Sequence, residues 1–211
     1  YKRQDVVSTL RDAVRCIDGL DSTQVTGISP LYRTDAWGMP AGTPDFRNAV
    51  VSVNTKLTAP ELLAGLQRIE ASHGRVRTDH WTSRTLDLDI IDFDGIVSDD
   101  PDLTLPHPRA WQRAFVLGPW LALDPDAELV GAHAGSVAQL LFESSDREHI
   151  DELAEDWMVA DDAAASPVTG SHHEEPASLQ TGSGQHRIES PVRSRRAVIS
   201  MDSPSTCLLY T

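Results

Sequence analysis

The sequence has few cysteines, and it lacks any long hydrophobic run. Cys16 and Cys207 lie far apart in the chain, which argues against a disulfide framework or a thiolate metal site and favours a reducing compartment. No segment approaches the roughly 18 consecutive apolar residues of a membrane-spanning helix, and no basic region precedes an apolar stretch as in a signal peptide. We therefore expect a cytoplasmic protein that does not act at a membrane.

Basic residues are scarce relative to acidic ones. The 211 residues include 18 Lys+Arg and 32 Asp+Glu, for a formal net charge of −14, and this balance argues against nucleic-acid binding. Only Lys2 and Lys56 are lysines, so 16 of the 18 basic residues are arginines. A high genomic GC content explains that bias without chemistry. Arginine nevertheless binds phosphate and carboxylate groups as a planar fork, so the positions of the arginines matter.

Composition divides the chain near residue 144. Residues 5–143 alternate apolar periodicity with turn residues, and we expect them to form one domain. Residues 144–162 form an acidic extension with eight acidic residues against one arginine. Residues 163–211 are rich in Ser, Gly, Pro, His and Arg, and their low apolar content predicts a disordered tail. Residues 1–4 and 206–211 resemble translated sequencing-adapter sequence more than protein sequence.

The patterns within residues 5–143 predict an α+β fold. Helical spacing covers residues 5–20, 58–74, 109–123 and 136–142, and strand patterns cover residues 25–33, 46–55, 86–93 and 103–105. Thr58 and Glu61 predict a capping box at the second helix. The local connections favour a ferredoxin-like α/β sandwich, in which helices cover an antiparallel-rich sheet. The sheet is expected to be one strand short, because a helix opens the chain with no strand before it.

Two aspartates alternate with apolar residues in the predicted strand 86–93. Asp87 and Asp89 fall on one face, and the intervening leucine and isoleucine residues fall on the other. The two carboxylates are then about 6.5–7 Å apart and repel each other unless a cation lies between them. Mg²⁺ relieves that repulsion, and its sites use one or two carboxylates together with substrate phosphates. The solvated face of a half-buried strand explains the same alternation.

Arginines flank this strand in the sequence. They could form ion pairs with carboxylates, or they could stabilise the charge on a transferring phosphoryl group. The sequence contains neither G-x-x-x-x-G-K-[ST] nor G-x-G-x-x-G, so any nucleotide would be held by arginines rather than by a glycine-rich loop. Trp81 lies in a polar loop, where an aromatic side chain favours a lid over a planar ligand. His107 stands between two prolines and is either a hydrogen-bond donor to phosphate or a turn residue. The arginines that flank the predicted strand are Arg75, Arg77, Arg84, Arg109 and Arg113.

Several segments together resemble a known family. The run from Arg75 through Trp81 to Asp87-Leu-Asp89-Ile90 is similar to the signature of 6-hydroxymethyl-7,8-dihydropterin pyrophosphokinases, enzymes of folate biosynthesis. The run Leu105-Pro-His107-Pro-Arg109, followed by Arg113-Ala-Phe115, resembles the second motif of that family. Tyr32-Arg-Thr34, Asp45-Phe46-x-Asn48 and Gln67-x-x-Glu70 match it in the same order. The resemblance covers roughly residues 5–143.

The resemblance implies transfer of a pyrophosphoryl group from ATP to the hydroxymethyl oxygen of the pterin, with release of AMP. It implies two Mg²⁺ ions held by Asp87 and Asp89, ATP as co-substrate, small-molecule partners only and a monomer. The catalytic residues would be Arg75, Arg84, Asp87 and Asp89. The ATP site would contain Gln67, Glu70, Arg77, Ile90, Thr104, His107 and Arg113, and the pterin site would contain Thr34, Phe46, Asn48, Trp81 and Phe115.

The chain departs from the family pattern at four places. Thr82-Ser83 stands where the family has Gly-Pro, Phe46 where it often has Tyr, and Asp35-Ala36-Trp37 where it has a proline-rich run. A strand and a Gly-Ser-Asn turn precede the first helix in the family, and here they are missing. A second hypothesis is therefore a non-catalytic nucleotide-binding remnant, inactive through the missing strand. An RNA-binding α+β domain is disfavoured by the acidity and by the lack of aromatics on a basic sheet face.

Overall fold

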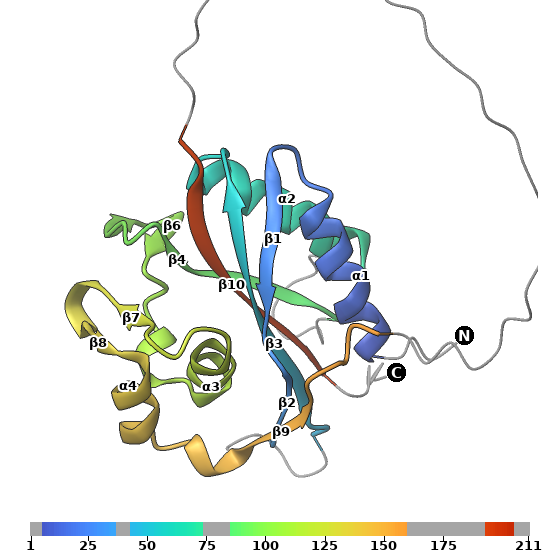
Figure 1. Cartoon of the computed structure of the whole chain (residues 1–211), viewed down its shortest axis with the longest axis vertical. Helices are drawn as coiled ribbons and strands as arrows, with labels where there is room; N and C mark the ends of the chain where they lie inside the picture. The colour runs from blue at the N-terminus through green and yellow to red at the C-terminus, as the bar shows by residue number, and fades with distance from the viewer. Residues whose placement is uncertain (1–5, 37–42, 74–84, 160–192, 205–211) are drawn as a thin grey trace, which may run out of the picture.

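A computed structural model of the chain describes residues 6–36, 43–73, 85–159 and 193–204, and these form an α+β fold (Figure 1). The main sheet has six strands in the order β4-β10-β3-β2-β9, with β1 pairing with β3 on the same side as β2. Every pairing in this sheet is antiparallel. The strands are β1 (Thr23–Ile28), β2 (Leu31–Thr34), β3 (Phe46–Thr55), β4 (Asp87–Phe93), β9 (Ile150–Ala154) and β10 (Arg195–Pro204).

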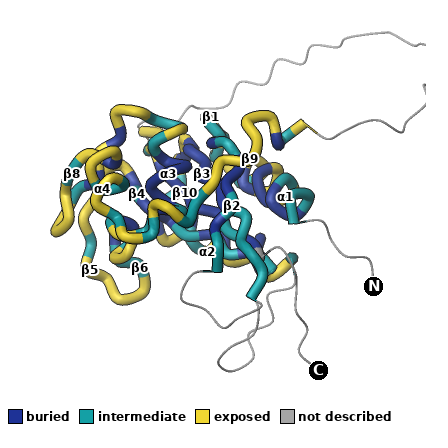
Figure 2. Tube along the Cα trace, turned by 90° about the horizontal axis from the view of Figure 1, so that it is seen from below, coloured by how far each residue is buried: buried dark blue, intermediate teal, exposed yellow. Residues whose placement is uncertain are grey.

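Four helices cover the two faces of this sheet (Figure 1). Buried residues of α1 and α2 pack with Val51 and Ile199 on one face, and buried residues of α3 and α4 pack with Val50 and Val198 on the other. Burial is concentrated in the sheet and in the inner sides of α1 and α3, as Figure 2 shows. The helices are α1 (Val6–Asp18), α2 (Ala59–Ser72), α3 (Ala114–Leu123) and α4 (Val137–Glu143).

Short elements complete the described chain outside the main sheet. Two small hairpins lie between β4 and α4 in the chain, and three 3₁₀ turns precede α3, join β7 to β8 and follow α4. The hairpins pair β5 (Ser98–Asp100) with β6 (Leu103–Leu105) and β7 (Glu128–Leu129) with β8 (Gly135–Ser136), and the 3₁₀ turns are η1 (Ala110–Gln112), η2 (Gly131–His133) and η3 (Arg147–His149).

The strand expected to be missing is present, but it comes from the C-terminal part of the chain. β10 lies between β3 and β4; it pairs with β3 along its whole length and with β4 from Ala197 to Asp202. Ala197, Ile199 and Met201 are fully buried against the face that α1 and α2 cover. The prediction of a disordered tail over residues 163–211 is therefore wrong for residues 195–204. Averaged composition concealed a short apolar run that becomes stable only by inserting between two distant strands.

The direction of β10 places it where a strand directly preceding α1 would lie. β10 and β1 both run antiparallel to β3, so they are parallel to each other. Arg195 and Thr23 both pair with Thr55, whereas Pro204 pairs with Phe46 at the other end of β3. β10 therefore ends at the edge of the sheet where α1 begins, as Figure 1 shows. The prediction that the sheet is one strand short is corrected by this arrangement.

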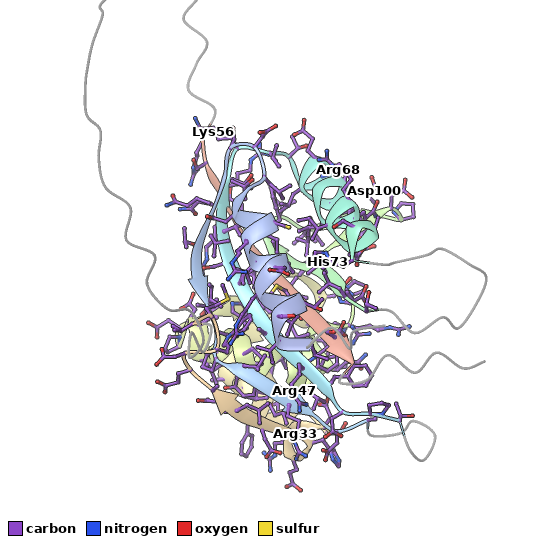
Figure 3. All side chains as sticks on the ribbon, turned by 90° about the vertical axis from the view of Figure 1, so that its right-hand side faces the viewer. Arg33, Arg47, Lys56, Arg68, His73 and Asp100 are labelled. Carbon is purple, nitrogen blue, oxygen red and sulfur yellow. The ribbon has the colours of Figure 1, made fainter. Side chains whose placement is uncertain are left out.

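The acidic extension contributes to the same fold. β9 pairs with β2, and Arg33 on β2 forms an ion pair of 2.5 Å with Asp151 on β9. Arg33 lies opposite Arg47 of β3, and both project at the same end of the molecule in Figure 3. Trp157 is 3% exposed, and its Nε1 donates a hydrogen bond of 2.9 Å to the carbonyl oxygen of Ser29. Composition predicted a separate extension over residues 144–162, but part of it packs on the sheet.

The predicted elements between residues 5 and 143 agree closely with the observed ones. The predicted capping box is present, with Thr58 and Glu61 bonded to each other's backbone at the start of α2. The predicted strand 25–33 is divided at Pro30, where the Ser29 hydroxyl accepts a hydrogen bond of 2.9 Å from the backbone of Val50. Proline has no N–H to donate to the sheet, which explains the interruption. The capping box and the proline thus fix two boundaries of the fold.

Candidate active site

The paired aspartates lie on β4 with their side chains on the face that α3 covers. Asp87 and Asp89 are partly exposed. Leu88, which lies between them, and Ile90, which follows Asp89, are buried against α1 and α2. Glu70 of α2 is 1% exposed, and its Oε1 accepts a hydrogen bond of 3.0 Å from the backbone N–H of Leu88. A buried carboxylate thus fixes the backbone between the two aspartates, which places both carboxylates on a rigid strand.

His107 is held beside Asp89. Its backbone N–H donates to the carbonyl oxygen of Ile91 at 2.9 Å, and its Nε2 lies 3.9 Å from Oδ2 of Asp89. Burial lowers the pKa of His107 from its ordinary value; Asp89 opposes this shift, and Arg113 and Arg109 add to it. The Nδ1 atom accepts a hydrogen bond of 3.1 Å from the backbone N–H of Arg109. A neutral imidazole therefore carries its proton on Nε2 and presents a donor toward the aspartates.

Arg113 stands at the start of α3, close to an aromatic side chain. Its guanidinium carbon lies 5.4 Å from the ring centroid of Phe115, a distance that allows a cation–π contact. The backbone N–H of Ala114 donates to both carboxylate oxygens of Asp146 at 3.1 Å. Asp146 belongs to the acidic segment and caps this helix from outside it. The segment was not expected to contribute to the site, yet it fixes the helix start that carries Arg113.

The residues expected to bind the pterin lie on β2 and β3. The hydroxyl of Thr34 donates a hydrogen bond of 2.6 Å to Oδ1 of Asn48, and both side chains are buried. This bond fixes the amide so that its NH₂ group is the part available to donate. Phe46 is partly exposed at the start of β3. In the strand pairing of the main sheet, only β10 lies between Asn48 on β3 and Asp87 on β4. The residues expected to bind the pterin and the metal are therefore close together.

The structure places the remaining predicted residues in three ways. Gln67 is exposed on α2, and Thr104 is partly exposed, with its hydroxyl bonded to the carbonyl oxygen of Asp100. The Ile90 side chain points into the core on the face opposite Asp89, so only its backbone could reach a nucleotide on the aspartate side. The other four residues lie outside the described residues; they are Arg75, Arg77, Trp81 and Arg84.

Hydrogen bonds join the two residues that flank segment 74–84. The Thr85 hydroxyl donates to the carbonyl oxygen of His73, and the carbonyl oxygen of Thr85 accepts a bond of 2.5 Å from the hydroxyl of Ser203. Ser203 belongs to β10, so the C-terminal strand supports the base of the segment that carries the predicted arginines. The alternation of apolar residues in Ala197-Val-Ile-Ser-Met201 is the sequence signal that could have indicated this strand.

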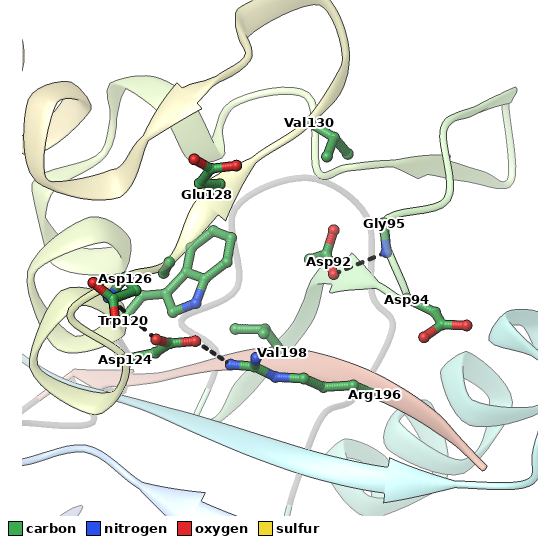
Figure 4. Close-up of a pocket in the computed structure, with 11 residues that line it drawn as sticks. Asp92, Asp94, Gly95, Trp120, Asp124, Asp126, Glu128, Val130, Arg196 and Val198 are labelled. Atoms are coloured by element: carbon green, nitrogen blue, oxygen red, sulfur yellow. Dashed lines mark hydrogen bonds and ion pairs between the residues drawn. The ribbon is translucent and has the colours of Figure 1, made fainter.

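A cavity of about 330 Å³ lies at the other end of β4 and β10 (Figure 4). Arg196 forms an ion pair of 2.6 Å with Asp124 at its side, and burial raises the pKa of Asp92. Trp120 and Asp92 each have one buried polar side-chain atom without a hydrogen-bond partner among the described residues. None of the predicted site residues lines this cavity, so it is separate from the aspartate pair.

The chemistry of the aspartate pair fits a hard divalent cation. Two carboxylates on adjacent same-face positions supply the oxygen ligands that Mg²⁺ prefers, and substrate phosphates commonly supply others. Among the described residues, no group of three or more His, Cys, Asp or Glu side chains is placed to ligate one ion. The site therefore suits an ion shared with a phosphorylated substrate.

The described part of the chain contains no helix long and apolar enough to cross a membrane.

A strand-borne carboxylate pair with a histidine beside it, on an α+β sheet, has the residue chemistry that metal-assisted phosphoryl transfer uses. The sequence model of the family described as 7,8-dihydro-6-hydroxymethylpterin-pyrophosphokinase matches residues 2–125. The chain belongs to this family, and the predicted resemblance is confirmed. β10 lies outside the matched residues.

Individual relatives agree with the family model. A 2-amino-4-hydroxy-6-hydroxymethyldihydropteridine pyrophosphokinase from Pseudomonas aeruginosa is 42% identical over 120 residues, which are 57% of this chain and 74% of that protein. The enzyme of the same name from Mycobacterium leprae is 42% identical over 139 residues, 60% of this chain and 72% of that protein. The one from Haemophilus influenzae is 35% identical over 144 residues, 68% of this chain and 88% of that protein.

Proposed function

We propose that this chain transfers the pyrophosphoryl group of ATP to the hydroxymethyl oxygen of 6-hydroxymethyl-7,8-dihydropterin, as its family does in folate biosynthesis. In this reaction the hydroxyl oxygen attacks the β-phosphorus, the bond from that phosphorus to the bridging oxygen of AMP breaks, and the hydroxyl proton is released. The observation that carries the proposal is the position of Asp87 and Asp89 on one strand face, with His107 3.9 Å from Asp89.

Asp87 and Asp89 would hold Mg²⁺, two ions in our proposal. When bound, the metal neutralises charge on the phosphates and polarises the attacking hydroxyl. The two carboxylates would hold the metal at a fixed place on β4, and His107 would donate a hydrogen bond from Nε2 to a phosphate oxygen. Arg113 adds a positive charge on the same side. Because such transfer depends on positioning and charge stabilisation, rigid anchoring by Glu70 and the Ile91 carbonyl is the main contribution of the fold.

The pterin would lie between Phe46 and Phe115, with Asn48 donating to an acceptor on its ring edge. Stacking between aromatic faces suits a planar heterocycle. The Thr34–Asn48 hydrogen bond supports this assignment because it orients the amide before the substrate binds. Arg75 and Arg84 keep their proposed catalytic role, Arg77 keeps its role in binding ATP, and Trp81 keeps its role in binding the pterin.

The hypothesis of a non-catalytic remnant was based on a missing strand. β10 fills that position in the sheet, so the hypothesis loses its structural basis. A monomer in the cytoplasm, with no macromolecular partner, remains our proposal. Release of AMP from ATP, Mg²⁺ and 6-hydroxymethyl-7,8-dihydropterin tests the activity directly. Folded protein that releases no AMP above the rate of an Asp89→Ala control would contradict the proposal.

A further inference from the structure

Two buried polar atoms in the cavity away from the aspartate pair have no hydrogen-bond partner among the described residues. Trp120 of α3 is 3% exposed, and one of these atoms is its Nε1, which carries a hydrogen to donate. The other is Oδ1 of Asp92 on β4, an acceptor; Oδ2 of the same carboxylate accepts a bond of 3.3 Å from the backbone N–H of Gly95. Buried polar groups are nearly always hydrogen-bonded in folded proteins. An unpaired donor and an unpaired acceptor at one cavity therefore point to a ligand.

The two atoms belong to different elements and do not bond each other. Trp120 projects from α3 and packs with Val198 of β10, and Val198 lies opposite Asp92 in the sheet. Figure 4 shows the indole and the Asp92 carboxylate on two sides of the cavity, with the indole nitrogen turned toward Val198 and Arg196, which also line it. A molecule lying in the cavity could therefore accept from the indole and donate to the carboxylate at the same time.

The charges around the cavity favour a cation. Of the eleven described residues that line it, five are acidic and Arg196 alone is basic. Arg196 already donates to Oδ2 of Asp124 at 2.6 Å, and Oδ1 of Asp124 accepts from the backbone N–H of Asp126 at 3.2 Å. Burial raises the pKa of Asp92, and the bond from Gly95 and the charge of Arg196 oppose this rise. A positive group beside Oδ1 of Asp92 would stabilise its charge further, whereas an anion would be repelled.

We propose that this cavity binds a small organic cation that also carries a hydrogen-bond acceptor, such as a primary ammonium group on a short chain with a hydroxyl. The ammonium group would donate to Oδ1 of Asp92, and the hydroxyl oxygen would accept from Nε1 of Trp120. An inorganic cation fits less well, because an indole N–H only donates and because no three His, Cys, Asp or Glu side chains of the described residues are placed to ligate one ion. The volume of about 330 Å³ is at the lower end of the range of ligand pockets, which suits a small molecule.

Binding of amino alcohols to the full, unaltered chain, followed by the NMR signals of the tryptophan indole N–H groups, tests the proposal. The probes are ethanolamine, propanolamine and butanolamine, in potassium chloride at physiological ionic strength, which screens non-specific attraction between charges. At least one probe should bind in the millimolar range and shift the indole signal of Trp120, identified as the signal absent from Trp120→Phe. The matching alkylamine, which lacks the acceptor, and the matching alcohol, which lacks the charge, should each bind at least about threefold more weakly.

Substitutions test the two contacts separately. Asp92→Asn keeps the size of the side chain and removes its charge, and it should weaken binding of the amino alcohol about tenfold. Asp126→Asn is the matched control: Asp126 is an exposed acidic residue of the same cavity, so its loss should change the affinity less than about twofold. Trp120→Phe should weaken binding of the amino alcohol and leave binding of the alkylamine unchanged, because it removes only the bond to the hydroxyl.

The proposal would be overturned by an indole signal of Trp120 that none of the three amino alcohols shifts. Equal binding of the amino alcohol and the matching alcohol, or equal effects of Asp92→Asn and Asp126→Asn, would overturn it as well. The comparison among probes uses the unaltered chain, so it holds even where a variant fails to fold. None of these measurements depends on AMP release, so the proposal and the proposed catalytic function stand or fall independently.

Discussion

Ser203 donates a hydrogen bond of 2.5 Å to the carbonyl oxygen of Thr85, and this bond joins the C-terminal strand to a residue just before β4, the strand that carries Asp87 and Asp89. Thr85 in turn bonds to the carbonyl oxygen of His73 at the end of α2. Three segments distant in sequence therefore meet at the base of the arginine-rich segment. The described fold makes β10 a structural part of the sheet that carries the aspartate pair.

Removal of residues 193–211 should abolish cooperative folding. The deletion removes four fully or almost fully buried apolar side chains, those of Ala197, Val198, Ile199 and Met201, and exposes the facing edges of β3 and β4. Burial of a large apolar side chain stabilises a protein by about 1.5–3 kcal/mol, so the loss approaches the whole stability of a typical domain. Urea unfolding followed by circular dichroism measures it. Deletion of residues 205–211 is the matched control and should keep a cooperative transition; equal stability of the two truncations would contradict the role of β10.

Trp157→Ala should destabilise the domain by about 3–5 kcal/mol. Trp157 is buried, donates from Nε1 to Ser29, and accepts a hydrogen bond from Nε of Arg11 at its carbonyl oxygen. Chemical denaturation gives the change in the free energy of unfolding. Val159→Ala, at an exposed position of the same segment, serves as the control and should cost little. A negligible effect of Trp157→Ala would mean that the acidic segment does not pack as described.

Stability should fall as the pH is lowered from about 7.5 to 5.5, and His107 should account for part of the fall. Burial lowers the pKa of His107 below its ordinary value of 6.5, so the folded state holds the imidazole neutral. The unfolded chain takes up a proton near pH 6.5, and acidification therefore favours unfolding. His107→Gln should give a shallower decline in melting temperature over this range. An equally steep decline in the variant would contradict the predicted direction of the shift.

Thr34→Val should weaken pterin binding about threefold to tenfold while leaving the KM of ATP unchanged. The substitution keeps the shape of the side chain but removes the hydroxyl that donates to Oδ1 of Asn48. The lost bond is worth about 0.5–1.5 kcal/mol, and the amide loses its fixed orientation. Titration calorimetry with the pterin measures the change, and Thr34→Ser, which retains the hydroxyl, should restore binding. Equal pterin affinity for Thr34→Val and the parent would remove Asn48 from the pterin site.

The elements that the sequence predicts well are those whose signals are local. α1 and β3 follow from their own periodicity, and α2 follows from the capping box at Thr58 and Glu61. Asp87 and Asp89 were placed on one face by the two-residue period of a strand, and the structure agrees. His107 and Arg113 were recognised from their motif, and their surroundings came only with the fold.

The elements that the sequence predicts poorly depend on distant partners. β10 pairs with strands more than 100 residues earlier, and nothing within residues 193–204 specifies where that strand inserts. Asp146 caps α3 from 32 residues away, and the acidic composition around it pointed to solvent instead.

The most direct test of the central claim is AMP release by the full chain from ATP, Mg²⁺ and 6-hydroxymethyl-7,8-dihydropterin, compared with Asp89→Ala. Asp89 is partly exposed on the site face, so its removal should leave the fold and pterin binding intact. The account predicts stoichiometric AMP and pterin diphosphate with the parent chain, and loss of at least about 100-fold in kcat with the variant, the effect of removing one charge-stabilising group. Folded parent protein without turnover, or a variant with undiminished kcat, would contradict it.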